Sequence, residues 1–205
     1  MPLLIATSYL PPALYMAEIA KADEIIVEAF ETYTKQTCRN HCLIYGPNGR
    51  QTLSIPVIKV NGNHTITKDI RISTHQPWQK THWRSIKTAY SNSPFFLFYQ
   101  DYLSPFYEKK FNFLIDLNIG LLETLMHIMH IHCEIRLSAY FEKSPAGVID
   151  QRTEPVAKHC LHPIAYPHYT QVFEPRHGFI PGLSILDVLL NLGPETSGYL
   201  KTLQP

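Results

Sequence analysis

The first 30 residues of the chain constrain its fold most strongly, because two short apolar runs flank a stretch of helix formers. Leu3–Ala6 and Glu24–Phe30 have the length and composition of buried strands. Pro12 suits the first turn of a helix, and Ala13–Ala22 is rich in residues that favour helices. Strand, helix and strand in so short a stretch form a right-handed crossover unit with parallel strands. The sequence therefore predicts an α/β fold that begins with a βαβ unit.

Two turn signals after this unit predict antiparallel hairpins in a mixed sheet. Asn48-Gly49 lies between apolar alternating runs, which is a strong hairpin signal. Asn61–Asn63 repeats the signal between the runs Ile55–Val60 and His64–Ile72. We expect three antiparallel strands to follow the crossover unit.

The later periodic stretches predict helices that cover the sheet and a C-terminal tail that docks on it. Trp78–Tyr90 has helical spacing, and Ser104-Pro105 is typical of a cap that opens a helix to about Met129. Ser184–Asp187 has the sequence of a capping box before a short final helix. At 205 residues we expect a single α/β domain, with a core at about 1–140 and an irregular extension at about 141–205.

The charge balance limits the classes of partner. With 18 basic and 17 acidic residues the net charge is +1, so no global field holds a polyanion and any anion site is local. We therefore expect no nucleic-acid partner. No run of about 18 apolar residues is present, and the first residues lack the basic region of a secretory signal. The sequence thus predicts a cytoplasmic protein without membrane insertion.

The cysteine and histidine spacings do not predict a metal site. Four cysteines in a chain of this length without a signal favour reduced thiols. A metal site can be drawn from six residues, none at CxxC or zinc-finger spacing: Cys38, His41, Cys42, His159, Cys160 and His162. His130 and His132 fall on one side of a predicted strand, where an exposed polar face is favoured over a metal pair.

The segment Glu31–His41 has the residue types of a binding site for an anion. Three types of group that bind phosphate or carboxylate occur close together in it: the ammonium of Lys35, the planar guanidinium of Arg39 and the amide of Asn40. This segment and the loop Tyr9–Pro12 leave the same edge of the parallel sheet, where ligands of such folds bind. We expect both to face one crevice. The alternative is that the two cations are solvated surface charges.

His82 is the first candidate for a general base. It lies on the predicted helix Trp78–Tyr90 between aromatic and basic residues. A histidine between an aromatic and an aliphatic residue is also typical of a packed core position, so that alternative stays open. Glu31 is the second candidate for the base.

The sequence resembles the WbqC-like family over at least positions 8–120. The resembling residues are Tyr9-x-Pro11-Pro12, Tyr33-x-Lys35-x-x-x-Arg39-Asn40, Asn48-Gly49, Leu53-Ser54-x-Pro56, Trp78-x-x-x-His82-Trp83, Ala89-Tyr90, Pro94-Phe95-Phe96 and Leu117-Asn118. The family more often has arginine at the position of His41. The resemblance implies a role in bacterial surface-polysaccharide (O-antigen) biosynthesis, in the modification of a nucleotide-linked amino sugar by a group such as an aminoacyl group.

Two functional hypotheses follow. In the first, the protein is a transferase whose anion site, formed by Lys35, Arg39 and Asn40, holds a nucleotide-linked or phosphorylated sugar. Aromatic side chains would then pack against the nucleobase or the sugar of this ligand. The candidates are Tyr9, Tyr33 and Trp83. In the second, it is a non-catalytic binding or scaffold protein of the same pathway, in which Arg39 and Asn40 fix the hairpin and His82 is a core residue. The sequence identifies no cofactor and leaves a homo-oligomer open.

Overall fold

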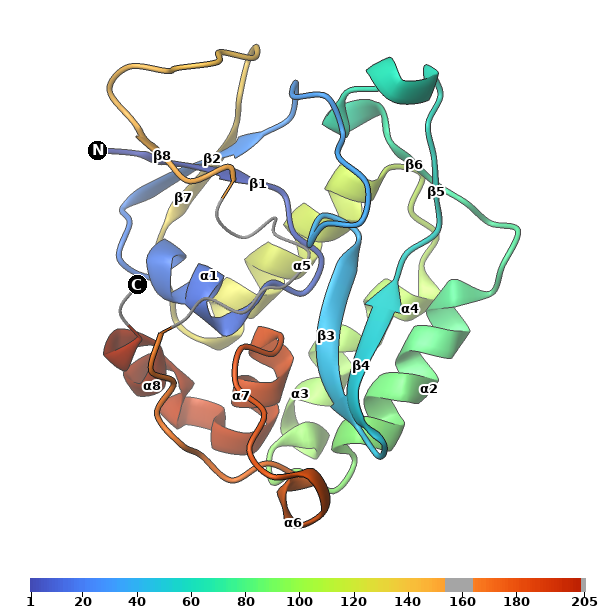
Figure 1. The fold of residues 1–205 in the computed structure, drawn as a ribbon, viewed down its shortest axis with the longest axis vertical. Coiled ribbons are helices and arrows are strands. Elements are labelled where there is room, and N and C mark those ends of the chain that lie inside the picture. The colour runs from blue at the N-terminus through green and yellow to red at the C-terminus, as the bar shows by residue number, and fades with distance from the viewer. Residues whose placement is uncertain (154–163, 204–205) are drawn as a thin grey trace.

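A four-stranded parallel sheet, with helices packed on one face, joins the first two strands of the chain to two strands from residues 134–150 (Figure 1). The computed structural model describes residues 1–153 and 164–203. Strands β1 (Leu3–Ala6), β2 (Glu24–Glu28), β7 (Glu134–Leu137) and β8 (Ile149–Asp150) pair in the order β7-β2-β1-β8, all parallel. Helix α1 (Ala13–Ile19) joins β1 to β2. The predicted α/β class and its βαβ unit are confirmed.

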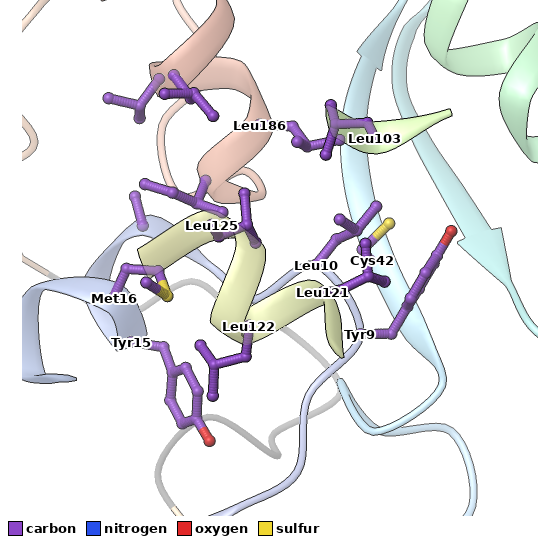
Figure 2. Close-up of a cluster of buried hydrophobic side chains, with 14 of the residues drawn as sticks. Tyr9, Leu10, Tyr15, Met16, Cys42, Leu103, Leu121, Leu122, Leu125 and Leu186 are labelled. Carbon is purple, nitrogen blue, oxygen red and sulfur yellow. The ribbon is translucent and has the colours of Figure 1, made fainter. Parts of the chain in front are cut away.

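The core lies between the sheet and the helices α1 and α5 (Leu114–Ile128). Ile25 and Val27 of β2 are buried in it, as alternation along a strand requires. Figure 2 shows Leu121, Leu122 and Leu125 of α5 in one cluster with side chains of α1 and of the later helix α7 (Ile185–Leu192). Each such leucine contributes about 1.5–3 kcal/mol on burial. This packing fixes the carboxyl ends of β1 and β2, from which the candidate site segments leave.

The antiparallel hairpins form two-stranded sheets of their own. Strand β3 (His41–Gly46) pairs with β4 (Gly49–Ser54), and Gly49 has φ +94°, a conformation that glycine adopts without strain. The N–H of Ser184 donates to the carbonyl of Leu43 on β3 (2.8 Å), so the C-terminal segment contacts the outer edge of this hairpin. The β3–β4 hairpin stands beside α2 (Trp78–Tyr90), whose predicted bounds are confirmed (Figure 1).

The second hairpin is shorter than predicted. Only β5 (Val57–Ile58) and β6 (Arg71–Ile72) pair, and the 3₁₀ turns η1 (Gly62–His64) and η2 (Thr67–Asp69) replace the long strand expected over residues 64–72. The backbone N–H groups of Thr67 and Lys68 instead donate to carbonyls of residues 31 and 29, each at 2.9 Å. Contacts with the segment after β2 therefore outcompete strand pairing.

The predicted long helix from residue 105 is two helices. Helix α4 (Pro105–Glu108) ends before α5 begins, and α3 (Phe96–Leu103) precedes it. The residues between α4 and α5 pair with the region of β6, because Ile72 N–H donates to Asn112 O and Leu114 N–H to Ile70 O, both at 3.0 Å. The prediction of one continuous helix is wrong for this reason.

The C-terminal tail docks on the core, as predicted. Helices α6 (Glu174–His177), α7 and α8 (Thr196–Thr202) follow one another at the bottom of Figure 1. The side chain of Ser184 caps α7 by accepting from Leu186 N–H (3.3 Å). The side chain of Asp187 does not complete a capping box. It is fully buried, and its Oδ2 accepts from Tyr169 Oη (2.6 Å) and Gln171 Nε2 (2.7 Å).

Asp187 should make stability fall as pH rises. Burial raises the pKa of its carboxyl from 3.8 to about 6, against the opposing effect of its hydrogen bonds. The folded chain thus binds this proton more tightly than the unfolded chain, so ionisation between pH 4 and 6 costs about 3 kcal/mol of stability. We expect Asp187→Asn to lack this loss. Urea unfolding from pH 4 to 7 measures it, and parallel profiles for the two proteins would contradict it.

Candidate functional site

An open groove of about 520 Å³ lies at the end of the β3–β4 hairpin nearest the segment that follows β2. Its polar lining comes from that segment, from the hairpin and from the strand region after it. The lining residues that matter here are Tyr33, Lys35, Asn40, His41, Ser54 and Lys59. The groove therefore brings together three of the residues singled out from the sequence, namely Tyr33, Lys35 and Asn40.

Two buried polar atoms in the groove lining lack a hydrogen-bond partner in the described part of the chain. They are Tyr33 Oη and Asn40 Oδ1, and their side chains are 3% and 6% exposed. An unsatisfied buried group of this kind costs about 1–3 kcal/mol. Burial also raises the pKa of Tyr33, partly opposed by the charge of Arg39, so its hydroxyl keeps its proton at neutral pH. Both atoms therefore have hydrogen-bonding capacity that no described residue uses.

Two lysines give the groove a positive charge. Lys35 is exposed, and the Nζ of half-buried Lys59 lies 5.6 Å from the centroid of the Tyr33 ring. No Asp or Glu lines the groove among the described residues. Sequence reasoning missed Lys59. Its position just after Pro56, where the expected strand is interrupted, is the signal that could have drawn attention to it.

Arg39 is buried in an ion pair and does not line the groove. Its side chain is 2% exposed, and both Nε (2.8 Å) and Nη2 (2.5 Å) donate to Glu31 Oε1. Its Nη1 donates to Thr37 Oγ1 (3.3 Å). Burial raises the pKa of Glu31, and the charge of Arg39 opposes that rise. The guanidinium is therefore engaged with a carboxylate of its own chain.

The two segments expected to share a crevice pack directly on each other. The N–H of Tyr9 donates to Cys38 O (2.8 Å), and Ser8 Oγ donates to the same carbonyl (3.2 Å). Asn118 of α5 joins them, because its Nδ2 donates to Thr7 Oγ1 (3.1 Å) and to Arg39 O (2.8 Å). The segments meet at the carboxyl edge of the sheet, where they form a contact.

His82 and Tyr9 lie in an aromatic cluster that borders the groove but does not line it. His82 is 4% exposed, and its Nδ1 lies 2.9 Å from Tyr9 Oη, which is 3.0 Å from Tyr107 Oη. Trp83 stacks on Tyr107 with ring centroids 5.4 Å apart. Burial lowers the pKa of His82 to about 4, although a hydrogen bond with the Ser54 backbone opposes this. The imidazole is therefore neutral at pH 7.

The described residues contain no group of three His, Cys, Asp or Glu side chains that could hold a metal ion. His159, Cys160 and His162, drawn into one possible site from the sequence, lie outside those residues. Cys42 and Cys133 are free thiols, whereas Cys38 is disulfide-bonded, so the expectation of reduced thiols is wrong for Cys38. None of the helices in the described ranges is long and apolar enough to cross a bilayer.

Comparisons with known proteins agree with the resemblance seen in the sequence. The model of the WbqC-like protein family matches residues 7–162. The uncharacterized protein Rv1507c of Mycobacterium tuberculosis is 27% identical over 228 residues, which cover 97% of this chain and 96% of that protein. No solved structure matches the chain.

Proposed function

Because the chain belongs to the WbqC-like protein family, we propose that its groove binds a nucleotide-linked or phosphorylated sugar for group transfer in bacterial surface-polysaccharide (O-antigen) biosynthesis. The observation that carries the proposal is the combination of Lys35 and Lys59 with two unpartnered buried polar atoms in one groove. Phosphate requires cations, and sugar hydroxyls both donate and accept hydrogen bonds. Such a ligand matches both features.

Each groove residue has a defined role in this proposal. Lys35 and Lys59 hold the phosphate groups. Tyr33 donates its hydroxyl proton and offers a ring edge to the sugar, and Asn40 Oδ1 accepts from a sugar hydroxyl. Arg39 is a positioning residue, because its carbonyl and its guanidinium tie the segment to α5 and to Glu31.

The proposal assigns no proton transfer to His82 or Glu31. The ring of His82 is enclosed by Tyr9 and its neighbours and does not line the groove. The Glu31 carboxylate is engaged by the guanidinium of Arg39. A general base for group transfer must therefore come from the groove itself, and His41 is the histidine that lines it.

A non-catalytic binding or scaffold protein of the same pathway is the second candidate. It is favoured by the internal bonds of the residues first assigned to chemistry. Asn40 Nδ2 donates to Ile55 O (2.9 Å), Arg39 pairs with Glu31, and His82 lies 2.9 Å from Tyr9 Oη. A protein that binds the sugar ligand but transfers no group from any donor would fit this second candidate.

We expect a nucleotide sugar to raise the melting temperature and the double variant Lys35→Met/Lys59→Met to lose that rise. A ligand at 100 times its dissociation constant stabilises by about 2.7 kcal/mol. At this chain length that corresponds to roughly 5–11 °C. The panel contains nucleotide sugars, free nucleotides, inorganic phosphate and amino acids, each at low and high salt, because screening weakens an anion site.

Lys80→Met is the matched control, since Lys80 is an exposed lysine of α2 that does not line the groove. It should keep the full shift. A shift that the double variant retains, or the absence of a shift with every phosphorylated compound, contradicts the proposed ligand class. Equal shifts with a free nucleotide and its sugar conjugate would assign recognition to the nucleotide.

A further inference from the structure

Ser54 and His41 face each other across the β3–β4 hairpin, at the end that borders the groove. They are directly opposite in the strand register, and Ser54 Oγ lies 3.1 Å from His41 Nε2. Both residues line the groove with Lys35 and Lys59. A hydroxyl within hydrogen-bond reach of an imidazole nitrogen is the arrangement of an activated nucleophile and its base.

The state of the imidazole suits this arrangement. His41 is half-buried, and that burial lowers the pKa of its ring below 6.5. The charged groups that line the groove beside it are Lys35 and Lys59, and both are cations. The ring is therefore neutral at pH 7. With the ring proton on Nδ1, Nε2 accepts the hydroxyl proton of Ser54.

We infer that Ser54 and His41 form a nucleophile–base pair that passes an acyl group from an acyl thioester to a hydroxyl or amine of the sugar in the groove. The inference deepens the proposed function and rests on it for the acceptor. The unpartnered Tyr33 Oη and Asn40 Oδ1 are independent signs that a ligand lies beside the pair.

The reaction has two balanced steps. In the first, His41 Nε2 takes the Ser54 hydroxyl proton while Ser54 Oγ bonds to the carbonyl carbon of the thioester. The bond from carbon to sulfur breaks, and the leaving thiolate takes the proton from His41. In the second, His41 takes a proton from the acceptor, which bonds to the acyl carbon as the ester bond to Ser54 breaks. Ser54 Oγ regains the proton, so the pair is restored.

The groove can also stabilise the negative oxygen that forms on the acyl carbon in each step. Lys35 and Lys59 supply positive charge in the groove where that oxygen forms. Donors that are fixed before reaction stabilise such an oxyanion more than mobile water does. The nucleophile, the base and these charged groups therefore line the same groove.

p-Nitrophenyl acetate is the probe for the first step. We expect a burst of nitrophenolate of about one equivalent per chain and one acetyl group on Ser54, located by peptide mass spectrometry. Ser54→Ala should carry no acetyl group at that position. His41→Gln should acylate Ser54 at least about 100-fold more slowly. Ser91→Ala and His64→Gln change exposed residues outside the groove lining and should react like wild type.

The pH profile separates a base from a merely structural histidine. In wild type the acylation rate should rise up to the lowered pKa of His41 and stay level to pH 8, whereas His41→Gln should show no such step. Acetylation of Lys35 or Lys59 in place of Ser54 would overturn the inference. So would a Ser54 acylation rate that is unchanged in His41→Gln.

The same variants distinguish failure of this inference from failure of the proposed function. Ser54→Ala should keep the thermal shift with a nucleotide sugar, because the lysines and Asn40 are intact. A nucleotide-sugar shift in wild type without any Ser54 adduct would keep the proposed function and overturn the nucleophile. A Ser54 adduct without any phosphorylated ligand would support the nucleophile–base pair and overturn the sugar as its acceptor.

Discussion

Replacing Arg39 with alanine should lower the free energy of unfolding by about 3–5 kcal/mol. The change leaves the carboxylate of Glu31, only 13% exposed, without the fork that now donates to it at 2.8 and 2.5 Å. Breaking a buried pair costs more than the pair contributes, because the remaining charge stays desolvated. The melting temperature should fall by roughly 6–20 °C at this chain length.

A double variant tests this cause. In Arg39→Ala/Glu31→Gln no unpaired charge is left, so part of the lost stability should return. Arg50→Ala is the matched control, because Arg50 is an exposed arginine on β4 of the same hairpin region, and it should change stability by less than about 0.5 kcal/mol. Urea unfolding at pH 7 measures all three. A loss below about 1 kcal/mol in Arg39→Ala would contradict the buried pair and return Arg39 to the candidate anion ligands.

The parts of the fold that the sequence predicted are those whose pattern is local. Leu3–Ala6 is buried on both faces and is an apolar run in the sequence. At the β3–β4 turn, Gly49 pairs with Gly46 and has a positive φ of +94°, which glycine adopts without strain. Trp78–Tyr90 keeps one buried face at helical spacing. In each case the residues that determine the element lie inside the element.

The elements that were predicted wrongly depend on partners distant in sequence. The segment after Asn61 forms the 3₁₀ turns η1 and η2 in place of a strand, and the N–H groups of residues 67 and 68 in η2 meet carbonyls of residues 31 and 29, which lie 36 and 39 positions earlier. The break between α4 and α5 exists because residues 112 and 114 pair with residues 70 and 72. Local propensity favours a continued strand and a continued helix there, and tertiary hydrogen bonds override it.

In the candidate site, the sequence identified residues by their chemical type, but only the folded structure shows where their side chains lie. The sequence identified Tyr33, Lys35 and Asn40, which do line one groove, from their chemical types. It could not show that Arg39 turns inward to Glu31, because both a solvated and a buried arginine fit the same spacing. Nor could it show that Lys59 Nζ lies 5.6 Å from the ring centroid of Tyr33, since that contact depends on how the segment after Pro56 packs beside the segment after β2.

The second large effect is expected at His82. In His82→Ala the free energy of unfolding should fall by about 3–5 kcal/mol, while the affinity of the groove for its ligand should stay unchanged. The imidazole fills a buried position against Trp78, with ring centroids 5.2 Å apart, and lies 2.9 Å from Tyr9 Oη. Alanine leaves a cavity and removes one of the two hydrogen-bond partners of that hydroxyl, the other being Tyr107 Oη. His75→Ala, at an exposed histidine just before α2, is the matched control and should have little effect.

The pH dependence of this effect tests whether His82 is a buried neutral residue. Burial lowers the pKa of its ring from 6.5 to about 4, so the unfolded chain takes up this proton at a higher pH than the folded one. As pH falls from 6.5 to 4, the free energy of unfolding of wild type should therefore decrease by up to about 3 kcal/mol because of this group. His82→Ala lacks the imidazole and should not show this decrease. The stability gap between the two proteins should narrow over this range. A constant gap, together with a variant that melts like wild type and binds ligand but lacks turnover, would instead make His82 the general base.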